Sequence, residues 1–512
     1  MNGAESLVHT LLGSGVDTCF TNPGTSEMHF VAALDRIPGV HCVLGLFEGV
    51  VTGAADGYAR VTGKPAATLL HCGPGLANGL ANLHNARRAS TPIVNIVGDQ
   101  ATYHRPNDPP LTADTEGWAR GASGWVRTAM DVASVGADAA AAVQASMIAP
   151  GQIATLILPS DTSWNEGGVV APPLPRLPTP LAAPNQVDEA AAILRRGGDG
   201  VVLMLGGEAL SEAGLALAHR IAVATSCALY ADAAPKIARG QGRVAVQRVP
   251  YVVDAAVQAM AATKRLILCG AKKPVTFFAY PGKPTTSIPN DAEVHVLARK
   301  DQDAVEALAR LADTLHAPAA PPPALGETPQ PGRGPLTPES FAATVGALIP
   351  DGAIIADESI TYGRGLGGFT EHSAPHLWLS PSGGAIGGGM PLATGAAVGA
   401  PGRRVINLQA DGSAMYTVQS LWTQARENLD VTTVLLSNRK YQILLGELAN
   451  VGANPGRTAL AMMDLGNPDL NWAGMAQAMG VEAARTDTAD GFADLLAGSL
   501  ERRGPFLIEL LV

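Results

Sequence analysis

The stretch from Val405 to Tyr441 constrains the fold more than any other part of this 512-residue chain. Val405–Gln409 is a short apolar run typical of a strand, and apolar residues then recur at helical spacing as far as Leu429. Val431–Leu436 is a second strand-like run. A strand, a helix and a strand in this order close right-handed with the two strands parallel. The stretch therefore predicts a parallel α/β sheet.

Asp411 and Asn438 each follow one of these two strands. Parallel strands end at the same edge of their sheet, and that edge is where open α/β sheets bind ligands. A carboxylate and an amide oxygen, with bare backbone at Gly412 and a hydroxyl at Ser413, suit Mg²⁺. A simple Asp-Gly turn is the alternative for Asp411. The residues alone leave both a turn and a magnesium site open.

Composition narrows the class of protein. Hydrophobic residues make up 47% and charged residues 16% of the chain, as in well-buried α/β domains. The net charge of −10, without a basic cluster, argues against nucleic acid as a partner. Five scattered cysteines without a CxxC pair indicate reduced thiols in a cytoplasmic protein. No signal peptide is apparent, and the uncharged Ser380–Gly402 is so rich in Gly and Pro that it suits a cofactor loop better than a membrane helix.

Two proline-rich segments divide the chain. Gly167–Val187 and Ala317–Thr337 both have the composition of extended linkers. Short apolar runs alternate with helical patterns in the blocks around them. We therefore predict three α/β domains with parallel sheets, over residues 1–166, 188–316 and 338–512.

Two side chains of the first block lie where strands are expected to end. Glu48 stands between a strand and a helix with apolar neighbours. An acid in a first helical turn complements the helix dipole, but a carboxyl among apolar groups can also keep a proton at neutral pH and share it with a ring nitrogen. His71 closes a strand; it is either a structural histidine or a general acid–base near pH 7.

Asp411 and Asn438 resemble the signature of thiamine-diphosphate enzymes, in which Gly-Asp-Gly is followed at a fixed distance by Asn-Asn. The chain departs from it at Ala410 and Ser437, positions that carry no metal-binding side chain. The run from Glu48 through Gly57-Tyr58-Ala59-Arg60 to Gly73-Pro74-Gly75 and Asn78 resembles the pyrimidine-binding domain of the same superfamily. The resemblance implies pyrimidine-binding, central and diphosphate-binding domains, with thiamine diphosphate and Mg²⁺ as cofactors.

The resemblance also implies roles at the diphosphate. Asp411, the Asn438 side chain and the Lys440 carbonyl would hold Mg²⁺ against it, beside Gly412 and Ser413. Thr361 would add a hydroxyl to the diphosphate.

The two cofactor rings have matching residues as well. Glu48 would hydrogen bond N1′ of the aminopyrimidine, and the Gly384 carbonyl would accept a hydrogen bond from the 4′-amino group. Ile386 would force the two rings into a V shape.

The substrate end of the site resembles benzoylformate decarboxylase in Asn22-Pro23-Gly24-Thr25-Ser26-Glu27 and Leu70-His71. This implies that Thr25 and His71 handle the substrate carboxylate and protons. The second active-site histidine of that enzyme is missing, since Phe277 stands near its position. Leu444 replaces the acid of pyruvate decarboxylase, although Glu447 lies one turn later. The expected pocket residues are Ser26, Phe277, Phe278, Ile443, Leu444 and Glu447.

The chain thus resembles the acetolactate synthase, benzoylformate decarboxylase and pyruvate decarboxylase group. We expect a non-oxidative decarboxylase of a 2-oxo acid that acts through a C2 carbanion/enamine. The alternatives are an acetolactate-synthase-like carboligase and a non-catalytic cofactor-binding subunit. FAD is not expected, because the central block is short and lacks a flavin signature, and Leu203–Gly207 lacks the GxGxxG of a nicotinamide-dependent dehydrogenase. The family implies a homodimer or homotetramer with shared active sites, and no membrane partner is expected.

Overall fold

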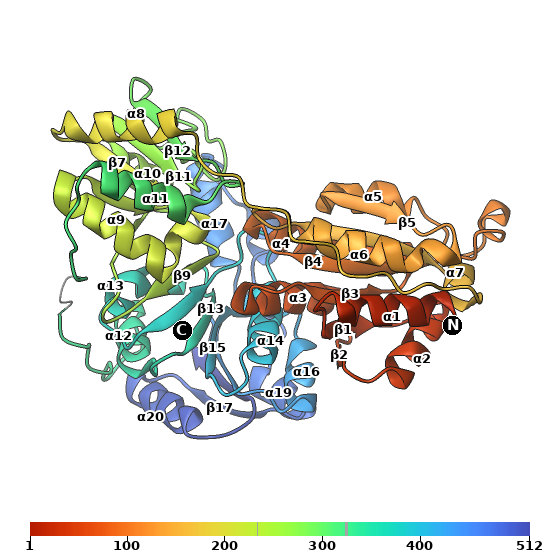
Figure 1. Ribbon diagram of the computed structural model, residues 1–512. Coiled ribbons are helices and arrows are strands. Elements are labelled where there is room, and N and C mark those ends of the chain that lie inside the picture. The colour runs from red at the N-terminus through yellow and green to blue at the C-terminus, as the bar shows by residue number, and fades with distance from the viewer. Residues whose placement is uncertain (233, 323–325) are drawn as a thin grey trace.

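Three layers of helices and strands build the protein (Figure 1). The computed structural model describes residues 1–232, 234–322 and 326–512. The N-terminal layer extends to one side, whereas the central and C-terminal layers stack at the other side. Nearly all paired strands are parallel. The prediction of an α/β protein with mainly parallel sheets is therefore confirmed, while the proposed domain boundaries stay predictions.

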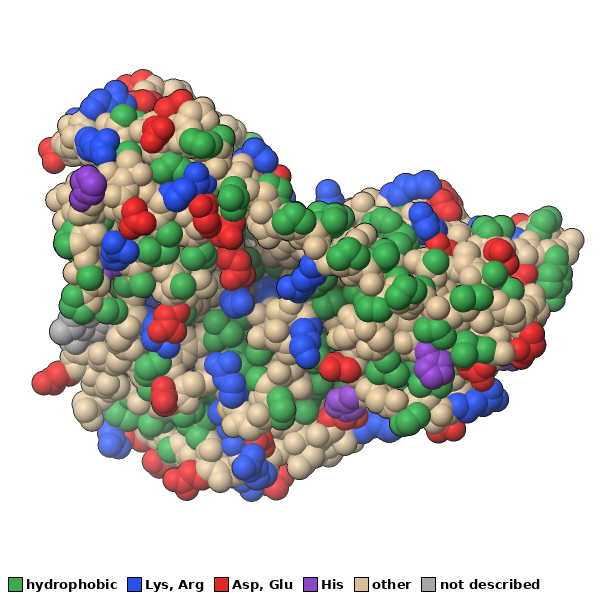
Figure 2. Space-filling view, in the orientation of Figure 1, with side chains coloured by type: hydrophobic (Ala, Val, Ile, Leu, Met, Phe, Trp, Pro, Cys, Tyr) green, Lys and Arg blue, Asp and Glu red, His purple; other side chains and the backbone are tan. Residues whose placement is uncertain are grey.

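The surface is hollowed where the central layer meets the N-terminal layer (Figure 2). On the face that Figure 2 shows, Lys and Arg side chains are interspersed with Asp and Glu side chains over all three layers. A surface that binds nucleic acid gathers its basic side chains on one face or in one stripe. On this face the basic side chains are not gathered in that way.

The N-terminal sheet has six parallel strands in the order β2-β1-β3-β4-β6-β5. Strands β3, β4 and β6 are buried along their whole length, as is typical of apolar strands covered on both faces. The strands are β1 (Thr18–Asn22), β2 (His41–Leu44), β3 (Ala66–Leu70), β4 (Ile93–Asp99), β5 (Trp125–Thr128) and β6 (Ile153–Pro159). The helices are α1 (Gly3–Gly13), α2 (Met28–Arg36), α3 (Glu48–Thr62), α4 (Cys72–Ala89), α5 (Thr115–Ala122), α6 (Val135–Ser146) and α7 (Ser160–Trp164).

The central sheet has five parallel strands in the order β10-β8-β7-β11-β12. Strands β7 and β11, which are neighbours within this sheet, are mainly apolar and buried. The strands are β7 (Val201–Leu205), β8 (Ala228–Ala231), β10 (Gln247–Arg248), β11 (Arg265–Cys269) and β12 (Glu293–Ala298). The helices are α8 (Pro184–Arg195), α9 (Glu212–Thr225), α10 (Val253–Met260) and α11 (Ala304–Thr314).

The C-terminal sheet has seven strands in the order β17-β18-β16-β15-β13-β14-β9. Strand β9 (Lys236–Arg239) comes from the middle of the chain and pairs antiparallel with β14 at the sheet edge. The other strands are β13 (Ile354–Glu358), β14 (His376–Leu379), β15 (Val405–Ala410), β16 (Val431–Ser437), β17 (Glu482–Thr486) and β18 (Phe506–Leu511). The helices are α12 (Pro338–Leu348), α13 (Leu366–Thr370), α14 (Gly389–Gly399), α15 (Asp411–Ala414), α16 (Ser420–Arg426), α17 (Gln442–Asn450), α18 (Arg457–Ala461), α19 (Trp472–Ala478) and α20 (Ala489–Leu500).

Two segments differ from the sequence-based expectation. Ser380–Gly402, expected to be a loop, contains helix α14, whose residues up to Ala397 are buried. Its glycines disfavour a helix in isolation, so tertiary packing stabilises it. The helix expected from the apolar spacing of Val418 to Leu429 is the shorter α16, and the additional short helix α15 begins at Asp411. Across the described ranges, no helix combines the length and the apolar character needed to cross a membrane.

Helices α3 and α14 join the N-terminal and C-terminal layers through glycine contacts. A Cβ atom at Gly57 would overlap the Leu392 carbonyl oxygen, and one at Gly395 would overlap the Ala54 carbonyl oxygen. At Gly53, a Cβ atom would lie 2.6 Å from the Pro391 Cβ. The two backbones therefore approach more closely than larger residues would permit.

Arg60, near the end of α3, ties the N-terminal layer to the edge of the C-terminal sheet, where Pro235 precedes β9 and Ser380 follows β14. Its Nε lies 2.7 Å from Asp56 Oδ1 in a buried ion pair. Its Nη1 donates to the carbonyl oxygens of Pro235 at 3.0 Å and Ser380 at 2.7 Å. One guanidinium of the N-terminal layer thus contacts both segments at that edge.

Gly57→Ala should weaken the α3–α14 contact. The added methyl group forces the helices apart, and overpacking of this kind costs about 1–3 kcal/mol. We expect a lower temperature for the first cooperative transition in differential scanning calorimetry. Gly498→Ala is the matched control, because a Cβ atom added there, in α20, would meet none of the described atoms within 4 Å, and alanine should stabilise by up to about 1 kcal/mol. Equal effects of the two substitutions would contradict the proposed constraint.

Candidate active site

Asp411 begins the loop at the carboxyl edge of the C-terminal sheet. Its carboxylate is buried; Oδ1 accepts a hydrogen bond from Gly412 N at 2.8 Å, and Oδ2 accepts one from Arg439 N at 2.7 Å. Burial raises the pKa of Asp411, and the two amides oppose that rise. No ion pair reaches Asp411 within the described ranges. A buried carboxylate whose bonds come from neutral amides has the donor chemistry expected of a Mg²⁺ ligand.

The second predicted metal-binding segment lies beside Asp411. Strands β15 and β16 are neighbours in the sheet, so Asn438 follows β16 at the same edge. Its Oδ1 accepts a hydrogen bond from Lys440 N at 3.0 Å. Arg439 between them has a φ of 56°, a left-handed conformation that is uncommon outside glycine. This backbone turns Arg439 N toward Asp411 and brings the three predicted metal-binding residues onto adjoining loops.

A buried glutamate that the sequence patterns do not single out organises the glycine loop. Glu358, the last residue of β13, is 4% exposed. Its carboxylate accepts hydrogen bonds from the amides of Gly387 at 3.0 Å, Gly388 at 3.2 Å and Gly389 at 2.9 Å. Burial raises the pKa of Glu358, while these bonds act in the opposite direction. Three successive amides directed at one carboxylate fix the loop and the first turn of α14.

The glycine loop also connects to the Asp411 loop. Gln409 Nε2 donates to Glu358 Oε2 at 2.8 Å and to Ser413 Oγ at 2.6 Å. Ser413 Oγ in turn donates to Ala410 O at 3.0 Å. The Ser413 hydroxyl, predicted to lie at the cofactor, is therefore hydrogen bonded within its own loop. Glu358, Gln409 and Ser413 form a continuous polar connection between the two loops.

The loop after β13, the third loop at the carboxyl edge of the C-terminal sheet, has a strained backbone. Ile360 follows β13 with a φ of 53°. A β-branched residue with positive φ is a genuine outlier, and such conformations concentrate at functional sites. The turn sets Thr361 immediately before a short helix over Tyr362–Gly365. No pattern in the sequence indicates this conformation.

The N-terminal layer contributes to the glycine loop as well. Asn82 and Asn85 of α4 donate to the carbonyl oxygens of Gly387 at 3.3 Å and Ala385 at 2.8 Å. Gly384 has a φ of 81°, which glycine adopts without strain. Ile386 lies between the two carbonyl groups that α4 holds. The predicted cofactor loop is thus fixed from both the sheet and the neighbouring layer.

Glu48 is the first residue of α3 and is 6% exposed. Asn78 Nδ2 donates to its Oε2 at 3.0 Å. A Cβ atom at Gly75 would lie 3.0 Å from Glu48 Oε1, so glycine keeps that oxygen free of crowding. For the residues that the structure describes, no hydrogen bond or ion pair links Glu48 or His71 to Asp411. Within the described residues, the predicted pyrimidine-binding and metal-binding residues are thus not joined by a direct polar contact.

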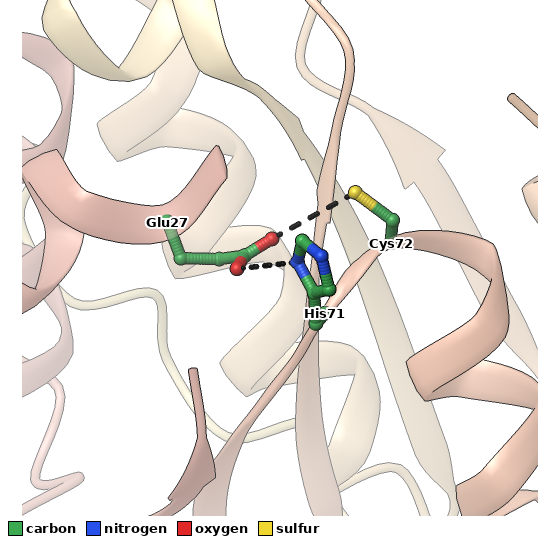
Figure 3. A group of neighbouring side chains, drawn as sticks. All are labelled: Glu27, His71 and Cys72. Carbon is green, nitrogen blue, oxygen red and sulfur yellow. Dashed lines mark hydrogen bonds and ion pairs between the residues drawn. The ribbon is translucent and has the colours of Figure 1, made fainter. Parts of the chain in front are cut away.

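A cavity of about 380 Å³ lies beyond the carboxyl ends of β1 and β3 and includes the predicted Thr25, Ser26 and His71 in its lining. His71 Nδ1 lies 2.9 Å from Glu27 Oε2 (Figure 3). The Ser26 hydroxyl donates a hydrogen bond to the same carboxylate. Glu27 also accepts a hydrogen bond from Gly24 N at 2.8 Å. Sequence reasoning does not assign Glu27 to the site, although its position three residues after Gly24 is typical of a side chain that closes a turn.

The predicted aromatic residues line a different part of the molecule. Phe277 and Phe278 are both more than half exposed, and their ring centroids are 4.8 Å apart. A Cβ atom at Gly384 would lie 2.7 Å from the Phe277 ring, so this loop touches the glycine loop. Among the described residues, those lining the cavity around His71 include neither phenylalanine.

Helix α17 carries the remaining predicted pocket residues. Tyr280 donates to Glu447 Oε2 at 2.6 Å, which is the main reason that the pKa of Tyr280 rises to about 12. This bond joins the aromatic loop of the central layer to α17. Ile443 is partly buried and Leu444 is 42% exposed one turn before Glu447. Glu447 is therefore hydrogen bonded to the phenol of Tyr280.

Known proteins match the chain along its whole length. Residues 1–121 and 366–510 match the N-terminal and C-terminal TPP binding domains of thiamine pyrophosphate enzymes. The protein named "Putative acetolactate synthase large subunit IlvX" from Mycobacterium tuberculosis is 50% identical over 100% of this chain and 99% of its own length. Benzoylformate decarboxylase from Pseudomonas aeruginosa is 28% identical over 97% of this chain and 96% of that protein.

A solved structure has the same fold. The Rhodococcus jostii RHA1 thiamine diphosphate-dependent 4-hydroxybenzoylformate decarboxylase has a TM-score of 0.84, with 23% identity over 100% of this chain and 99% of that chain. At this identity the similarity concerns the fold. It extends through all three layers.

Glu358→Gln should loosen the glycine loop. The new amide group faces donors that the carboxylate accepted, and a buried donor left without an acceptor costs about 1–3 kcal/mol. We expect faster hydrogen exchange at the amides of Gly387–Gly389 and a lower unfolding temperature. Glu339→Gln, at an exposed position in α12, is the control and should change neither. Unchanged exchange in Glu358→Gln would show that the carboxylate does not hold the loop.

Proposed function

Because this chain belongs to the thiamine diphosphate-dependent enzyme family, we propose that it is a Mg²⁺-dependent, non-oxidative decarboxylase of a 2-oxo acid. The observation that carries this proposal is the cavity in which Glu27 holds His71 beside Thr25 and Ser26. A carboxylate that binds one imidazole nitrogen fixes the ring and leaves the other nitrogen for proton transfer. Thr25 and Ser26 supply hydroxyl groups that can bind the substrate carboxylate.

The diphosphate end of the site is assigned to the C-terminal loops. Asp411, Asn438 and the Lys440 carbonyl would hold Mg²⁺, and Gly412 leaves room for the diphosphate. The burial of Asp411, satisfied by amides alone, supports this assignment. Thr361, held at the same edge by the strained Ile360, would add a hydroxyl group.

The ring end of the site is assigned to residues from two layers. Thiamine diphosphate, when bound, would supply a carbanion that adds to the substrate carbonyl and would then hold the electron pair left behind when CO₂ departs. Glu48 would hold a proton at the pyrimidine nitrogen, and Asn78 orients that carboxyl group. The Gly384 carbonyl would accept from the amino group, and Ile386 would set the angle between the rings.

A complete site on this assignment needs two chains. Glu48 and His71 lie apart from Asp411 in the hydrogen-bond network of a single described chain. We therefore propose a homodimer or homotetramer in which Glu48 of one chain and Asp411 of another serve the same cofactor. Phe277, Phe278, Ile443 and Leu444 would then form the apolar side of the substrate pocket.

One comparison favours a second candidate function. The M. tuberculosis relative with 50% identity carries the name of an acetolactate synthase subunit. An acetolactate-synthase-like carboligase would join the acyl unit left after decarboxylation to a second 2-oxo acid or an aldehyde. Exposed apolar residues such as Phe278 and Leu444 would suit such an acceptor.

The decisive measurement is CO₂ release with identification of the organic product. The protein, loaded with thiamine diphosphate and Mg²⁺, is offered benzoylformate, pyruvate and longer 2-oxo acids separately. We expect a free aldehyde, and a roughly 10²–10⁴-fold lower kcat in Glu48→Gln because the proton at the pyrimidine nitrogen is lost. A coupled hydroxy ketone or acetohydroxy acid would favour the carboligase. No CO₂ from any of these acids, despite bound cofactor, would contradict both.

His71→Gln tests the assignment of the acid–base group. Glutamine keeps the polarity but cannot exchange a proton, so kcat should fall by about 10²–10⁴-fold. His29→Gln is the matched control, because His29 lines the same cavity but packs against Trp164, and its kcat should stay within a few-fold of the parent. If both variants lose activity equally, the effect belongs to the cavity and His71 has no special role.

A further inference from the structure

Cys72, which the proposed reaction does not use, completes a cluster of metal-binding atoms with Glu27 and His71. A Glu27 carboxylate oxygen, His71 Nδ1 and Cys72 Sγ all lie within 4.8 Å of one another (Figure 3). Cys72 Sγ is 4.0 Å from Glu27 Oε1 and 3.1 Å from Ser26 Oγ. These groups come from the turn after β1 and from the junction of β3 with α4, so the fold brings together residues distant in the sequence.

The backbone holds the thiol in this cluster against its local preference. Cys72 has a φ of 52°, a left-handed conformation that residues other than glycine adopt only when the surrounding structure imposes it. Cys72 is also the first residue of α4, directly after His71. On the other side, a Cβ atom at Gly24 would overlap the His71 ring, so glycine there lets the turn close over the imidazole. Both features allow the thiol, the imidazole and the carboxylate to lie close together.

The donor set selects a particular class of cation. Thiolate, imidazole and carboxylate are the ligands of tetrahedral Zn²⁺, with bonds of about 2.0–2.3 Å. Such bonds place neighbouring ligand atoms roughly 3.3–3.8 Å apart. Here His71 Nδ1 lies 2.9 Å from Glu27 Oε2, Cys72 Sγ lies 4.0 Å from Oε1 of the same carboxylate, and one ligand atom from each residue lies within 4.8 Å of the others. Mg²⁺ takes oxygen ligands instead and keeps several waters, so it competes poorly for sulfur and nitrogen.

The cavity gives a cation a way in and a free coordination position. His71 is 24% exposed by side chain and lines the cavity together with Ser26 and Cys72. Two more imidazoles, His29 and His104, lie in the same lining. Three protein ligands with one position open to solvent is the usual arrangement of an accessible Zn²⁺ site.

We propose that Glu27, His71 and Cys72 form a Zn²⁺ site whose occupation switches off the enzyme. Water or Ser26 Oγ takes the fourth position. On binding, Cys72 gives its thiol proton to solvent and coordinates as the thiolate. The imidazole binds the metal through Nδ1, so the single proton of the neutral ring resides on Nε2.

The inhibitory part of this proposal rests on the proposed function of His71. With Nδ1 bound to the cation and Nε2 protonated, neither ring nitrogen has a free lone pair. The ring can then no longer accept a proton from the reaction. Zn²⁺ would also occupy the space in which Thr25 and Ser26 meet the substrate carboxylate. Zn²⁺ should therefore inhibit even when Mg²⁺ saturates the Asp411 site.

Binding is tested with Co²⁺, a spectroscopic substitute for Zn²⁺, added to the protein saturated with thiamine diphosphate and Mg²⁺. We expect one thiolate-to-cobalt charge-transfer band that saturates at one Co²⁺ per chain and disappears when Zn²⁺ is added. Cys72→Ser should abolish the band, and Glu27→Gln should weaken Co²⁺ binding at least tenfold. Cys42→Ser, which removes the exposed cysteine, should leave the band unchanged. No band in the parent, or a band that survives in Cys72→Ser, would overturn the site.

The inhibition is tested separately, so that failure of the site and failure of the proposed reaction can be distinguished. With Mg²⁺ in excess, Zn²⁺ should stop turnover at the concentration that displaces Co²⁺, and Cys72→Ser should need at least tenfold more Zn²⁺. Activity that persists in the Zn²⁺-loaded parent would overturn the inhibitory role. The cobalt spectra require no turnover, so they decide on the metal site even if no 2-oxo acid is a substrate.

Discussion

The close contact between α3 and α14 is the constraint that fixes how one chain places its Glu48 group relative to its glycine loop. Glycines at Gly57 and Gly395 let the two helices touch backbone to backbone. Glu48 begins α3, and the glycine loop leads directly into α14, so this one contact sets both groups relative to each other. The hydrogen bonds of Arg60 to Pro235 and Ser380 then attach the β9–β14 edge of the C-terminal sheet to helix α3. The glycines at this contact matter more for the relative position of the two helices than for the stability of the protein.

Two buried carboxylates shape the site, and neither forms an ion pair with a described cationic side chain. Glu358 and Asp411 both lie at the carboxyl edge of the C-terminal sheet and are satisfied chiefly by backbone amides. Removing a charge from water is unfavourable unless it is hydrogen bonded. Each carboxylate therefore imposes one conformation on the loop that supplies its donors. The loops at this edge derive their order from this electrostatic requirement, since glycine-rich segments have little order of their own.

Much of this arrangement can be predicted from the sequence, because strands with two covered faces are apolar runs. The strands β15 and β16 begin where those runs begin, and the positions of Asp411 and Asn438 follow from parallel pairing. The Glu27–His71 pair joins residues 44 positions apart, and no local pattern encodes such a contact. The positive φ angles of Cys72 and Ile360 likewise arise from tertiary packing that overrides local preference. The same kind of packing makes α14 a helix where its glycines and prolines predict a loop.

Strand β9 has a consequence for how such a protein can diversify. It belongs to the middle of the chain yet closes the edge of the C-terminal sheet beside β14 (Figure 1). An open edge exposes unpaired backbone groups that invite pairing with other chains. Exchanging the middle segment for that of a relative would uncover this edge unless the replacement brought an equivalent strand. The middle segment therefore cannot be exchanged independently of the C-terminal sheet. Recombination at the proline-rich linkers is restricted to donors that conserve the pairing of β9 with β14.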